Sequence, residues 1–351
     1  MAAFAGADGA ESQTANEHGG DLGTARAMFP GAPEPFLDLS TGINPNPYPV
    51  PPLSGDIWAK LPDAGGHERL IAAAVAAYGA PSPVHIVPAP GTQILLPLVF
   101  GLVPPGRAAV LAPTYLEHAR AAALAGHGVT EVADIGVLGG YRLAVVTNPN
   151  NPDGRLVAKE ELLALAKKLR TSGGLLVIDE AFMDIGRERA SLAGEVGCGN
   201  VVVLRSFGKF FGLAGLRLGF ALAAPALAAR ISALLGPWSV SGPALTIGAQ
   251  ALADGAWIGA TRDRLTAAAT RLDAILAAAG LDIVGGTALY RLAQSPAAGA
   301  LFHQLGQAGI FVRRFRDHPQ WLRFGLPSSE LDWQRLQTAM ARFGDKARMQ
   351  P

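Results

Sequence analysis

The sequence of 351 residues contains a single cysteine, Cys198. One cysteine excludes a disulfide within the chain, and such sparse use of cysteine is typical of a reducing compartment. Residues 1–17 are rich in Ala, Gly and polar residues, but they lack the basic start and the long apolar core of a secretory signal. We therefore expect a cytoplasmic protein.

Charge is scarce as well: 16% of the residues are charged, and the formal net charge is +1. This balance gives no electrostatic reason to expect nucleic acid or an anionic membrane surface as a partner. No apolar run reaches the roughly 18 residues of a membrane span without a charged residue, Gly or Pro interrupting it. We expect neither partner, and no bound metal.

Apolar residues are abundant, at 50% of the chain. A chain of this length buries a large core and is expected to form two domains. We expect an N-terminal arm over residues 1–44, a large domain over 45–238 and a small α+β domain over 239–351. Residues 1–17 contain too little apolar surface to become ordered, and the rest of the arm is expected to join the small domain.

The large domain is expected to alternate helices and apolar strands, which indicates a mostly parallel sheet covered on both faces. In such sheets ligands lie at the carboxyl ends of the strands. The predicted strands cover 84–87, 108–111, 143–147, 175–178 and 201–204, and the predicted helices cover 68–78, 91–103, 116–125 and 159–169. In the small domain we expect strands at 287–292, 310–314 and 321–324, and a last helix over 330–343.

The stretch from Val201 to Phe220 carries the clearest chemistry. Lys209 follows a buried strand, where an ammonium is costly to desolvate, and a lysine in such a place can form a Schiff base with a carbonyl. Ser206 and Arg217 lie close by in sequence and could hold an anion. A carbonyl together with a phosphate describes pyridoxal 5'-phosphate (PLP). The alternative is a strand–loop–strand segment with solvated basic residues.

Polar residues also follow the other predicted strands. Gly91-Thr92-Gln93 precedes a helix, where free amides favour a phosphate, unless it is an ordinary helix start. Asp179 needs a positive partner at its strand end, which a protonated pyridine nitrogen or a nearby arginine would supply. Asn151 could donate to a phenolic oxygen or belong to a plain turn. Tyr115 could lie on a cofactor face or pack in the core.

Taken together, the motifs Asn-Pro-Asn-Asn-Pro, Asp-Glu-Ala, Ser-x-x-Lys and Gly-Leu-Arg-Leu-Gly resemble the fold-type-I PLP enzymes, the aspartate aminotransferase superfamily. The resemblance covers nearly the whole chain. It implies a seven-stranded, mostly parallel large-domain sheet, PLP as cofactor and a homodimer. It identifies Lys209 as the Schiff-base lysine and Asp179 as the partner of the pyridine nitrogen. The implied cofactor-binding residues are Gly91, Thr92, Gln93, Tyr115, Asn151, Asp179, Phe182, Ser206, Lys209 and Arg217.

Two motifs near the N-terminus indicate a particular subgroup of this superfamily. His18-Gly19-Gly20-Asp21 and the stretch ending in Asn44-Pro45 resemble the opening of the threonine-phosphate decarboxylases of cobalamin biosynthesis. The resemblance implies a lyase that removes carbon dioxide from a small phosphorylated amino acid. The implied substrate-binding residues are His18, Gly19, Gly20, Asn44, Arg313 and Arg323. Arg323 would bind the carboxylate, and we expect Arg313 rather than Arg314 to contact the substrate.

Three positions depart from the wider family pattern: Phe182 and Leu61 where relatives often have tyrosine, and Asp153 where threonine is common. These departures disfavour a standard amino-acid transaminase. One alternative is a 2-oxoglutarate-dependent aminotransferase of the histidinol-phosphate type. A more distant one is a PLP-fold protein that serves as a binding module without catalysis.

Overall fold

A computed structural model of the chain describes residues 18–186 and 190–349. The predicted disorder of residues 1–17 lies outside the described residues. The chain divides into two compact units, which we call the large unit (46–263) and the small unit (1–45 and 264–351). The division falls later than the predicted position after residue 238, because α10 (Gly242–Ala253) still packs on α4 (Ala64–Tyr78) of the large unit. A Cβ at Gly248 of α10 would lie 2.9 Å from Cδ1 of Leu70.

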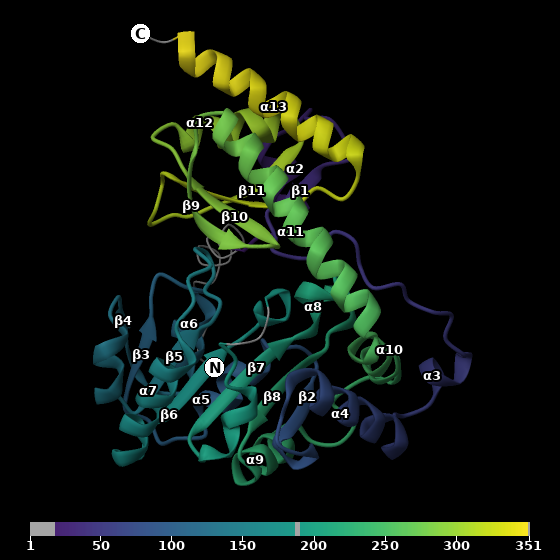
Figure 1. The fold of residues 1–351 in the computed structure, drawn as a ribbon, viewed down its shortest axis with the longest axis vertical. Coiled ribbons are helices and arrows are strands. Elements are labelled where there is room, and N and C mark those ends of the chain that lie inside the picture. The colour runs from purple at the N-terminus through teal and green to yellow at the C-terminus, as the bar shows by residue number, and fades with distance from the viewer. Residues whose placement is uncertain (1–17, 187–189, 350–351) are drawn as a thin grey trace, which may run out of the picture. The chain divides into compact units, whose positions relative to one another are not determined.

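The large unit is built on a seven-stranded sheet, which confirms the predicted α/β class (Figure 1). The strand order is β2-β8-β7-β6-β5-β3-β4, and only β8 runs antiparallel to its neighbours. The strands are β2 (Ile86–Ala89), β3 (Arg107–Leu111), β4 (Gly128–Val132), β5 (Leu143–Thr147), β6 (Leu175–Asp179), β7 (Val201–Ser206) and β8 (Gly219–Ala223). The apolar runs of β5 to β7 are fully buried, as expected for strands covered on both faces.

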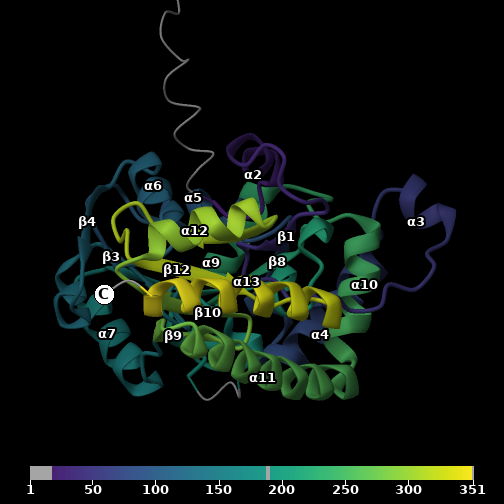
Figure 2. The same cartoon turned by 90° about the horizontal axis from the view of Figure 1, so that it is seen from above.

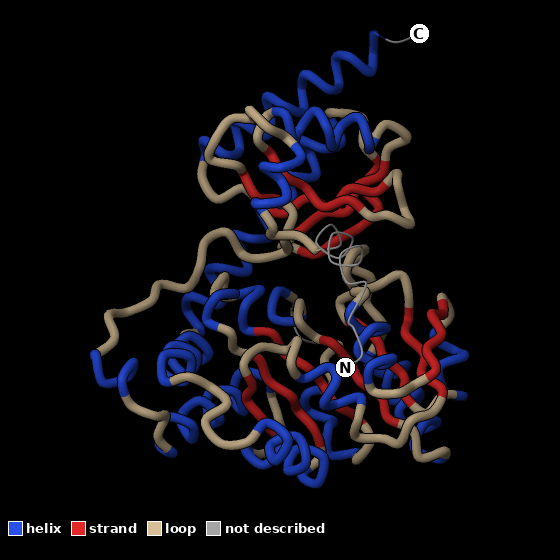
Figure 3. The backbone as a smooth tube through the Cα atoms, turned by 180° about the vertical axis from the view of Figure 1, so that it is seen from behind, coloured by secondary structure: helices blue, strands red, loops and turns tan. Residues whose placement is uncertain are grey.

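Helices flank these strands in the large unit (Figure 3). Besides α4 and α10 they are α3 (Gly55–Ala59), α5 (Leu95–Phe100), α6 (Glu117–Leu124), α7 (Lys159–Thr171), α8 (Phe207–Phe210) and α9 (Pro225–Leu235). Short 3₁₀ turns cover Pro83–His85, Ile135–Gly140, Met183–Ile185, Ala193–Cys198 and Ala214–Leu216. The predicted helix over 91–103 covers only Leu95–Phe100 in the structure; Gly91, with a φ of +87°, cannot belong to a right-handed helix. No helix of the described residues is long and apolar enough to span a membrane.

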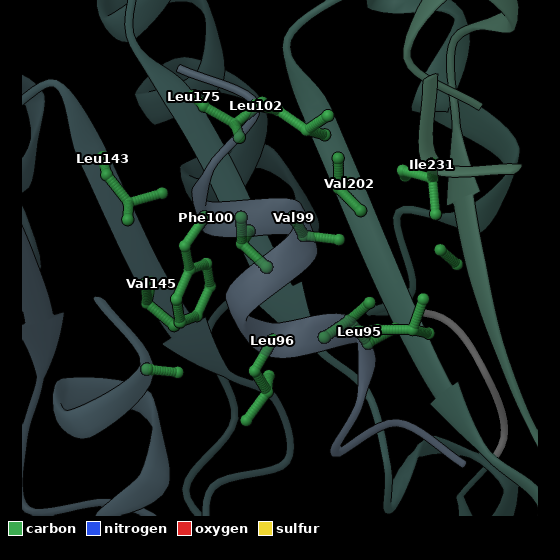
Figure 4. Close-up of a cluster of buried hydrophobic side chains, with 14 of the residues drawn as sticks. Leu95, Leu96, Val99, Phe100, Leu102, Leu143, Val145, Leu175, Val202 and Ile231 are labelled. Carbon is green, nitrogen blue, oxygen red and sulfur yellow. The ribbon is translucent and has the colours of Figure 1, made fainter. Parts of the chain in front are cut away.

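One core cluster joins α5 to the middle of the sheet (Figure 4). Leu95, Val99 and Phe100 of α5 are inaccessible to solvent. They pack against strand side chains that include Val145 of β5 and Val202 of β7. Deleting one such large side chain typically costs about 2–5 kcal/mol. This cluster keeps the central strands, and therefore their carboxyl ends, in a fixed arrangement.

The small unit contains a five-stranded sheet in the order β1-β11-β12-β10-β9, in which β1 and β11 are parallel and the other pairs antiparallel. The strands are β1 (Leu37–Leu39), β9 (Asp282–Thr287), β10 (Tyr290–Gln294), β11 (Ile310–Arg314) and β12 (Trp321–Gly325). The prediction of one strand over 287–292 was wrong, since the chain turns there between β9 and β10. Gly286, with a φ of +140°, permits the close approach of the two strands, because a Cβ there would meet the backbone of Tyr290.

Among the described residues, the small unit also contains the helices α2 (Leu22–Met28), α12 (Ala298–Gln307) and α13 (Glu330–Met349). The helices α12 and α13 lie side by side (Figure 2), where Gln304 Nε2 donates to the Ala339 carbonyl at 3.0 Å. The long helix α11 (Gly255–Ala278) begins in the large unit and ends in the small unit. Through β1 the N-terminal segment becomes an edge strand of the small-unit sheet.

Candidate active site

The carboxyl ends of β5, β6 and β7 bring predicted site residues together at one edge of the large-unit sheet. In the register of the parallel strands, Thr147 pairs with Asp179 and Asp179 pairs with Leu204. The loop after β5 carries Asn151, and the short helix after β7 carries Lys209. Residues far apart in the sequence therefore share one edge, which is where ligands bind in such sheets.

Lys209 belongs to α8, which starts directly after β7. Its side chain is half-buried, and Nζ lies 5.8 Å from the centre of the Phe182 ring. The turn into α8 is tight at Gly208, where a Cβ would lie 2.9 Å from the Ala214 Cα. The glycine at position 208 therefore lets the chain fold back closely beside the lysine.

Asp179 has a buried partner that the sequence patterns did not reveal. His118 of α6 is fully buried, and its Nε2 lies 3.1 Å from Asp179 Oδ2. The other carboxylate oxygen, Oδ1, accepts from the Ala181 N–H at 3.0 Å. The Tyr115 ring packs edge-on against His118, with 5.6 Å between the ring centroids. The three-residue spacing from Tyr115 to His118, across the start of a helix, was the one sequence signal for this contact.

A cradle is formed by four residues: Gly91, Thr92, Arg217 and Gly219. A side chain at either glycine would fill it. A Cβ at Gly91 would lie 2.6 Å from Arg217 Nη2, and a Cβ at Gly219 would lie 2.8 Å from the Thr92 nitrogen. Arg217 itself has a φ of +53°, an unusual conformation for a residue with a side chain. Its guanidinium therefore lies directly against backbone that only glycine can provide. This cradle fits an anionic phosphate.

The predicted ring-stacking tyrosine is held by its hydroxyl. Tyr115 Oη donates to Gln93 Oε1 at 3.2 Å, and Gln93 Nε2 donates to Glu117 Oε2 at 3.1 Å. This chain of hydrogen bonds links Gln93, next to the cradle, to the start of α6. Gln93 thus contacts Tyr115 in the structure, and Ser206 lies buried at the end of β7.

The loop after β5 is fixed by its own side chains. Asn148 exchanges two hydrogen bonds with the Val157 backbone, at 2.9 and 3.2 Å. Asn150 Nδ2 donates to Asp153 Oδ1 at 2.8 Å and to the Pro113 carbonyl at 2.9 Å. Asp153, one of the departures from the family pattern, therefore stabilises this loop. Asn151 lies half-buried between these anchors.

In the small unit, Arg313 of β11 and Arg323 of β12 are paired directly across two antiparallel strands. Residues opposite one another in this way project from the same face of the sheet, whereas Arg314 projects from the other face. Arg323 is 7% exposed, and its Nη2 donates to the Ser40 carbonyl at 2.8 Å. Burial lowers the pKa of the Arg323 guanidinium, although Tyr290 and Asp38 oppose that shift. Like charges this close are unfavourable and favour an anion beside them.

The His18-Gly19-Gly20 segment packs against Ser40. The Gly20 N–H donates to Ser40 Oγ at 2.7 Å, and Ser40 Oγ donates to Asp38 Oδ1 at 2.6 Å. A Cβ at Gly19 would collide with the Ser40 carbonyl, so only glycine permits this approach. A cavity of about 20 Å³ is lined by His18, Gly19, Ser40, Arg313 and Arg314, among others. Asn44, four residues beyond Ser40, is buried.

Similarity to known proteins places these features in a family. The chain belongs to the aminotransferase class I and II family, whose sequence model matches residues 51–342. It is 45% identical over 328 residues to a threonine-phosphate decarboxylase of Sinorhizobium sp, covering 93% of this chain and 97% of that protein. It is 40% identical over 334 residues to a threonine-phosphate decarboxylase of Pseudomonas aeruginosa, covering 94% and 99%. The predicted resemblance to this family is thereby confirmed.

A solved structure supports the fold. The histidinol-phosphate aminotransferase of Sinorhizobium meliloti, solved in complex with pyridoxal-5'-phosphate, superposes with a TM-score of 0.73 over 84% of each chain, at 24% sequence identity. At this identity the likeness concerns the fold. The large unit with its seven-stranded sheet is therefore that of a fold-type-I enzyme.

Proposed function

We propose that this protein is a PLP-dependent lyase that decarboxylates L-threonine O-3-phosphate to (R)-1-amino-2-propanol O-2-phosphate in cobalamin biosynthesis. The two decarboxylases of 45% and 40% identity, matched over nearly their full length, support this substrate. The observation that carries the proposal is the register of Arg313 opposite Arg323. Two facing guanidinium groups suit a substrate with two anionic groups, a carboxylate and a phosphate.

The large unit is proposed to hold the cofactor. When bound, PLP takes up the electron pair that bond cleavage leaves at the substrate Cα. Lys209 would hold the cofactor aldehyde, and its Nζ would later donate a proton to Cα. Asp179, fixed by His118 at 3.1 Å, would accept from the protonated ring nitrogen. The cradle of Gly91, Thr92, Arg217 and Gly219, with Ser206, would bind the phosphate.

Three more cofactor contacts are proposed on the large unit. Tyr115, oriented by Gln93, would lie against one face of the ring. Asn151 would donate to the phenolic oxygen. Phe182 would contact the cofactor through its ring alone, because it lacks the hydroxyl that a tyrosine would offer. The phenolic oxygen would therefore have one donor fewer than in relatives with tyrosine.

The small unit is proposed to orient the substrate. Arg323 would bind the carboxylate through a two-pronged hydrogen bond, and Arg313 would bind the phosphate together with His18, Gly19, Gly20 and Asn44. Two fixed anchor points determine which bond at Cα stands perpendicular to the cofactor ring. Holding the carboxylate perpendicular favours loss of carbon dioxide over loss of the Cα proton.

The test is a product assay with the PLP-loaded protein. With L-threonine O-3-phosphate we expect release of carbon dioxide and one equivalent of aminopropanol phosphate, without any need for 2-oxoglutarate. With histidinol phosphate and 2-oxoglutarate we expect no glutamate. Glutamate formation from histidinol phosphate, with no carbon dioxide from threonine phosphate, would replace the proposal with the aminotransferase alternative.

We further propose a cytoplasmic homodimer. The large unit exposes several big apolar side chains, including Trp58 at 69%, Leu61 at 67% and Trp238 at 61% exposure. Such side chains would be covered in a dimer, and burying them would favour association. Light scattering coupled to gel filtration should give a mass of two 36.2 kDa chains. A mass of one chain at micromolar concentration would contradict the dimer.

A further inference from the structure

A buried guanidinium lies next in sequence to the proposed cofactor residues of the large unit. Arg205 precedes Ser206 on β7 and is 1% exposed. Its Nε lies 3.0 Å from Glu180 Oε2, and its Nη1 donates to Asp184 Oδ1 at 2.7 Å. Its Nη2 donates to Ser191 Oγ at 3.1 Å. One side chain thus joins β7 to two points of the segment that follows Asp179.

Glu180 is held from several sides. Its Oε2 accepts from Ser191 Oγ at 2.7 Å, and its Oε1 accepts from the Leu192 N–H at 2.8 Å. Burial raises the pKa of the Glu180 carboxyl, while the positive charge of Arg205 and these hydrogen bonds oppose the rise. Burying charges carries a large desolvation penalty, so such a cluster is weak evidence for stability. A positional role would explain its presence at this place.

The two carboxylates that bind Arg205 flank Phe182, at two residues to either side. The Phe182 ring lies 5.8 Å from Lys209 Nζ. Because residue 182 lacks a hydroxyl, it is positioned by packing and by the backbone on either side of it. Arg205 binds the side-chain carboxylates of both Glu180 and Asp184. The segment 180–184 is therefore fixed relative to the strand that leads to Lys209.

A second arginine, Arg262, also binds this segment. Arg262 Nε donates to the Asp184 carbonyl at 2.9 Å. Its guanidinium lies 5.9 Å from the ring centre of Phe210, the residue after Lys209. Asp184 is thus joined to Arg205 through its side chain and to Arg262 through its backbone. Both connections lead to residues next to the reactive end of β7.

We propose that Arg205 is a positioning residue: it holds segment 180–184 so that Asp179 and Phe182 keep their places beside Lys209 and the bound cofactor. This inference rests on the proposed PLP chemistry, since it assigns Arg205 a role in orienting that cofactor. Arg205 itself is expected to contact neither cofactor nor substrate. Its removal should therefore alter the orientation of bound PLP and lower kcat, with little effect on KM.

The experiment distinguishes an effect on cofactor orientation from an effect on protein stability. It does so by removing the charges of Arg205, Glu180 and Asp184 together. In the variant Arg205→Met/Glu180→Gln/Asp184→Asn no buried charge of the cluster lacks its counter-charge, so its melting temperature should return close to that of the wild type. The single variant Arg205→Met should melt well below both. The readouts are the circular dichroism band of bound PLP, which reports ring orientation, and kcat and KM for L-threonine O-3-phosphate.

We expect the triple variant to keep a weakened or shifted dichroism band and a kcat at least tenfold below wild type, in spite of its recovered melting temperature. Recovery of the band and of kcat together with the melting temperature would overturn the proposal. If the triple variant does not fold, Asp184→Leu alone provides the decision, because it removes the acceptor for Arg205 Nη1 and keeps the Arg205–Glu180 pair. A wild-type band and kcat in Asp184→Leu would then overturn the proposal.

Two controls complete the design. Arg205→Lys keeps the charge but cannot reach three acceptors from a planar group, so it should show an intermediate band. Lys159→Met removes an ion pair with Glu195 (2.8 Å) elsewhere in the large unit and should leave band and kcat unchanged. The dichroism readout requires only bound PLP. It therefore remains decisive for Arg205 even if the wild type proves to be an aminotransferase, in which case kcat is measured for that reaction.

Discussion

The large and small units handle charge in opposite ways. In the large unit, Asp179 Oδ2 lies 3.1 Å from His118 Nε2, and the charge of Arg205 is matched by two carboxylates. In the small unit, two arginines face one another across a strand pair. The difference suits a cofactor that stays bound in one case and an anionic substrate that comes and goes in the other. The matched charges around Arg205 stabilise a permanent site, whereas the two facing arginines, with Asp38 beside Arg323, give affinity for an anionic substrate.

The strongest test of the large unit is Lys209→Ala. We expect a loss of at least about 10⁴-fold in kcat, because the proposed anchor of the cofactor and the proton donor disappear together. The measurement is carbon dioxide release under saturating PLP, with the absorbance of bound PLP recorded in parallel. Lys159→Ala, which removes an ion pair with Glu195 on the same unit, serves as the control. An undiminished rate in Lys209→Ala would refute the covalent site altogether.

The small unit is tested by two neighbouring arginines. Arg313→Met should raise KM for L-threonine O-3-phosphate about 10- to 100-fold, the range expected for losing a charged hydrogen-bonding group. Arg314→Met is the matched comparison: both arginines line the cavity beside His18, but the guanidinium of Arg314 lies 4.8 Å from the Phe302 ring, and residue 314 alternates to the other face of the strand. We expect less than a threefold change for Arg314→Met. A larger effect at 314 than at 313 would exchange the two assignments.

A smaller effect is expected in the phosphate cradle. Gly91→Ala places a Cβ 2.6 Å from Arg217 Nη2 at a φ of +87°. The strain of about 1–3 kcal/mol should weaken PLP binding about tenfold, measured by fluorescence titration of the apoprotein. Gly140→Ala is the matched control, since a Cβ there would meet nothing within 4 Å. Equal PLP affinities for the two variants would argue against the cradle.

Much of the large unit could be predicted from the sequence because its signals are local. The runs Leu175–Ile178 and Val201–Leu204 are apolar throughout, and the polar residues that follow them fall at strand ends in any parallel sheet. The order of residues along the chain was therefore enough to place Asp179 and Lys209 at one edge. PLP and the family were also anticipated, through the spacing of the motifs.

What could not be predicted depends on contacts between distant segments. His118 meets Asp179 across two elements, and nothing in the local pattern distinguishes it from a core histidine. Arg205 lies inside a buried strand. The sequence pattern shows only that it belongs to the stretch from Val201 to Phe220 and does not reveal its carboxylate partners. The hairpin between β9 and β10 was missed because its turn residues, Ala288 and Leu289, are apolar. That Arg313 lies opposite Arg323 could be known only from the strand register. A shift of the register by one residue would place the two side chains on opposite faces of the sheet.

The smallest expected effect is the one that most directly tests the contrast between the units. If Arg313 and Arg323 repel each other, Arg313→Met should stabilise the ligand-free protein by about 0.2–1 kcal/mol, or roughly 0.3–1.4 °C in melting temperature. Inorganic phosphate should stabilise the wild type, because a ligand that binds only the folded state raises its stability by mass action. The same phosphate should stabilise Arg313→Met much less, so that the two melting temperatures converge as phosphate is added. Scanning calorimetry of the apoprotein at low ionic strength, with matched additions of sodium chloride, makes the comparison. The carboxylate of Asp38 already acts on Arg323. A wild type that is more stable than Arg313→Met without phosphate would mean that Asp38 outweighs the repulsion between the two arginines, and the small unit would then resemble the large one.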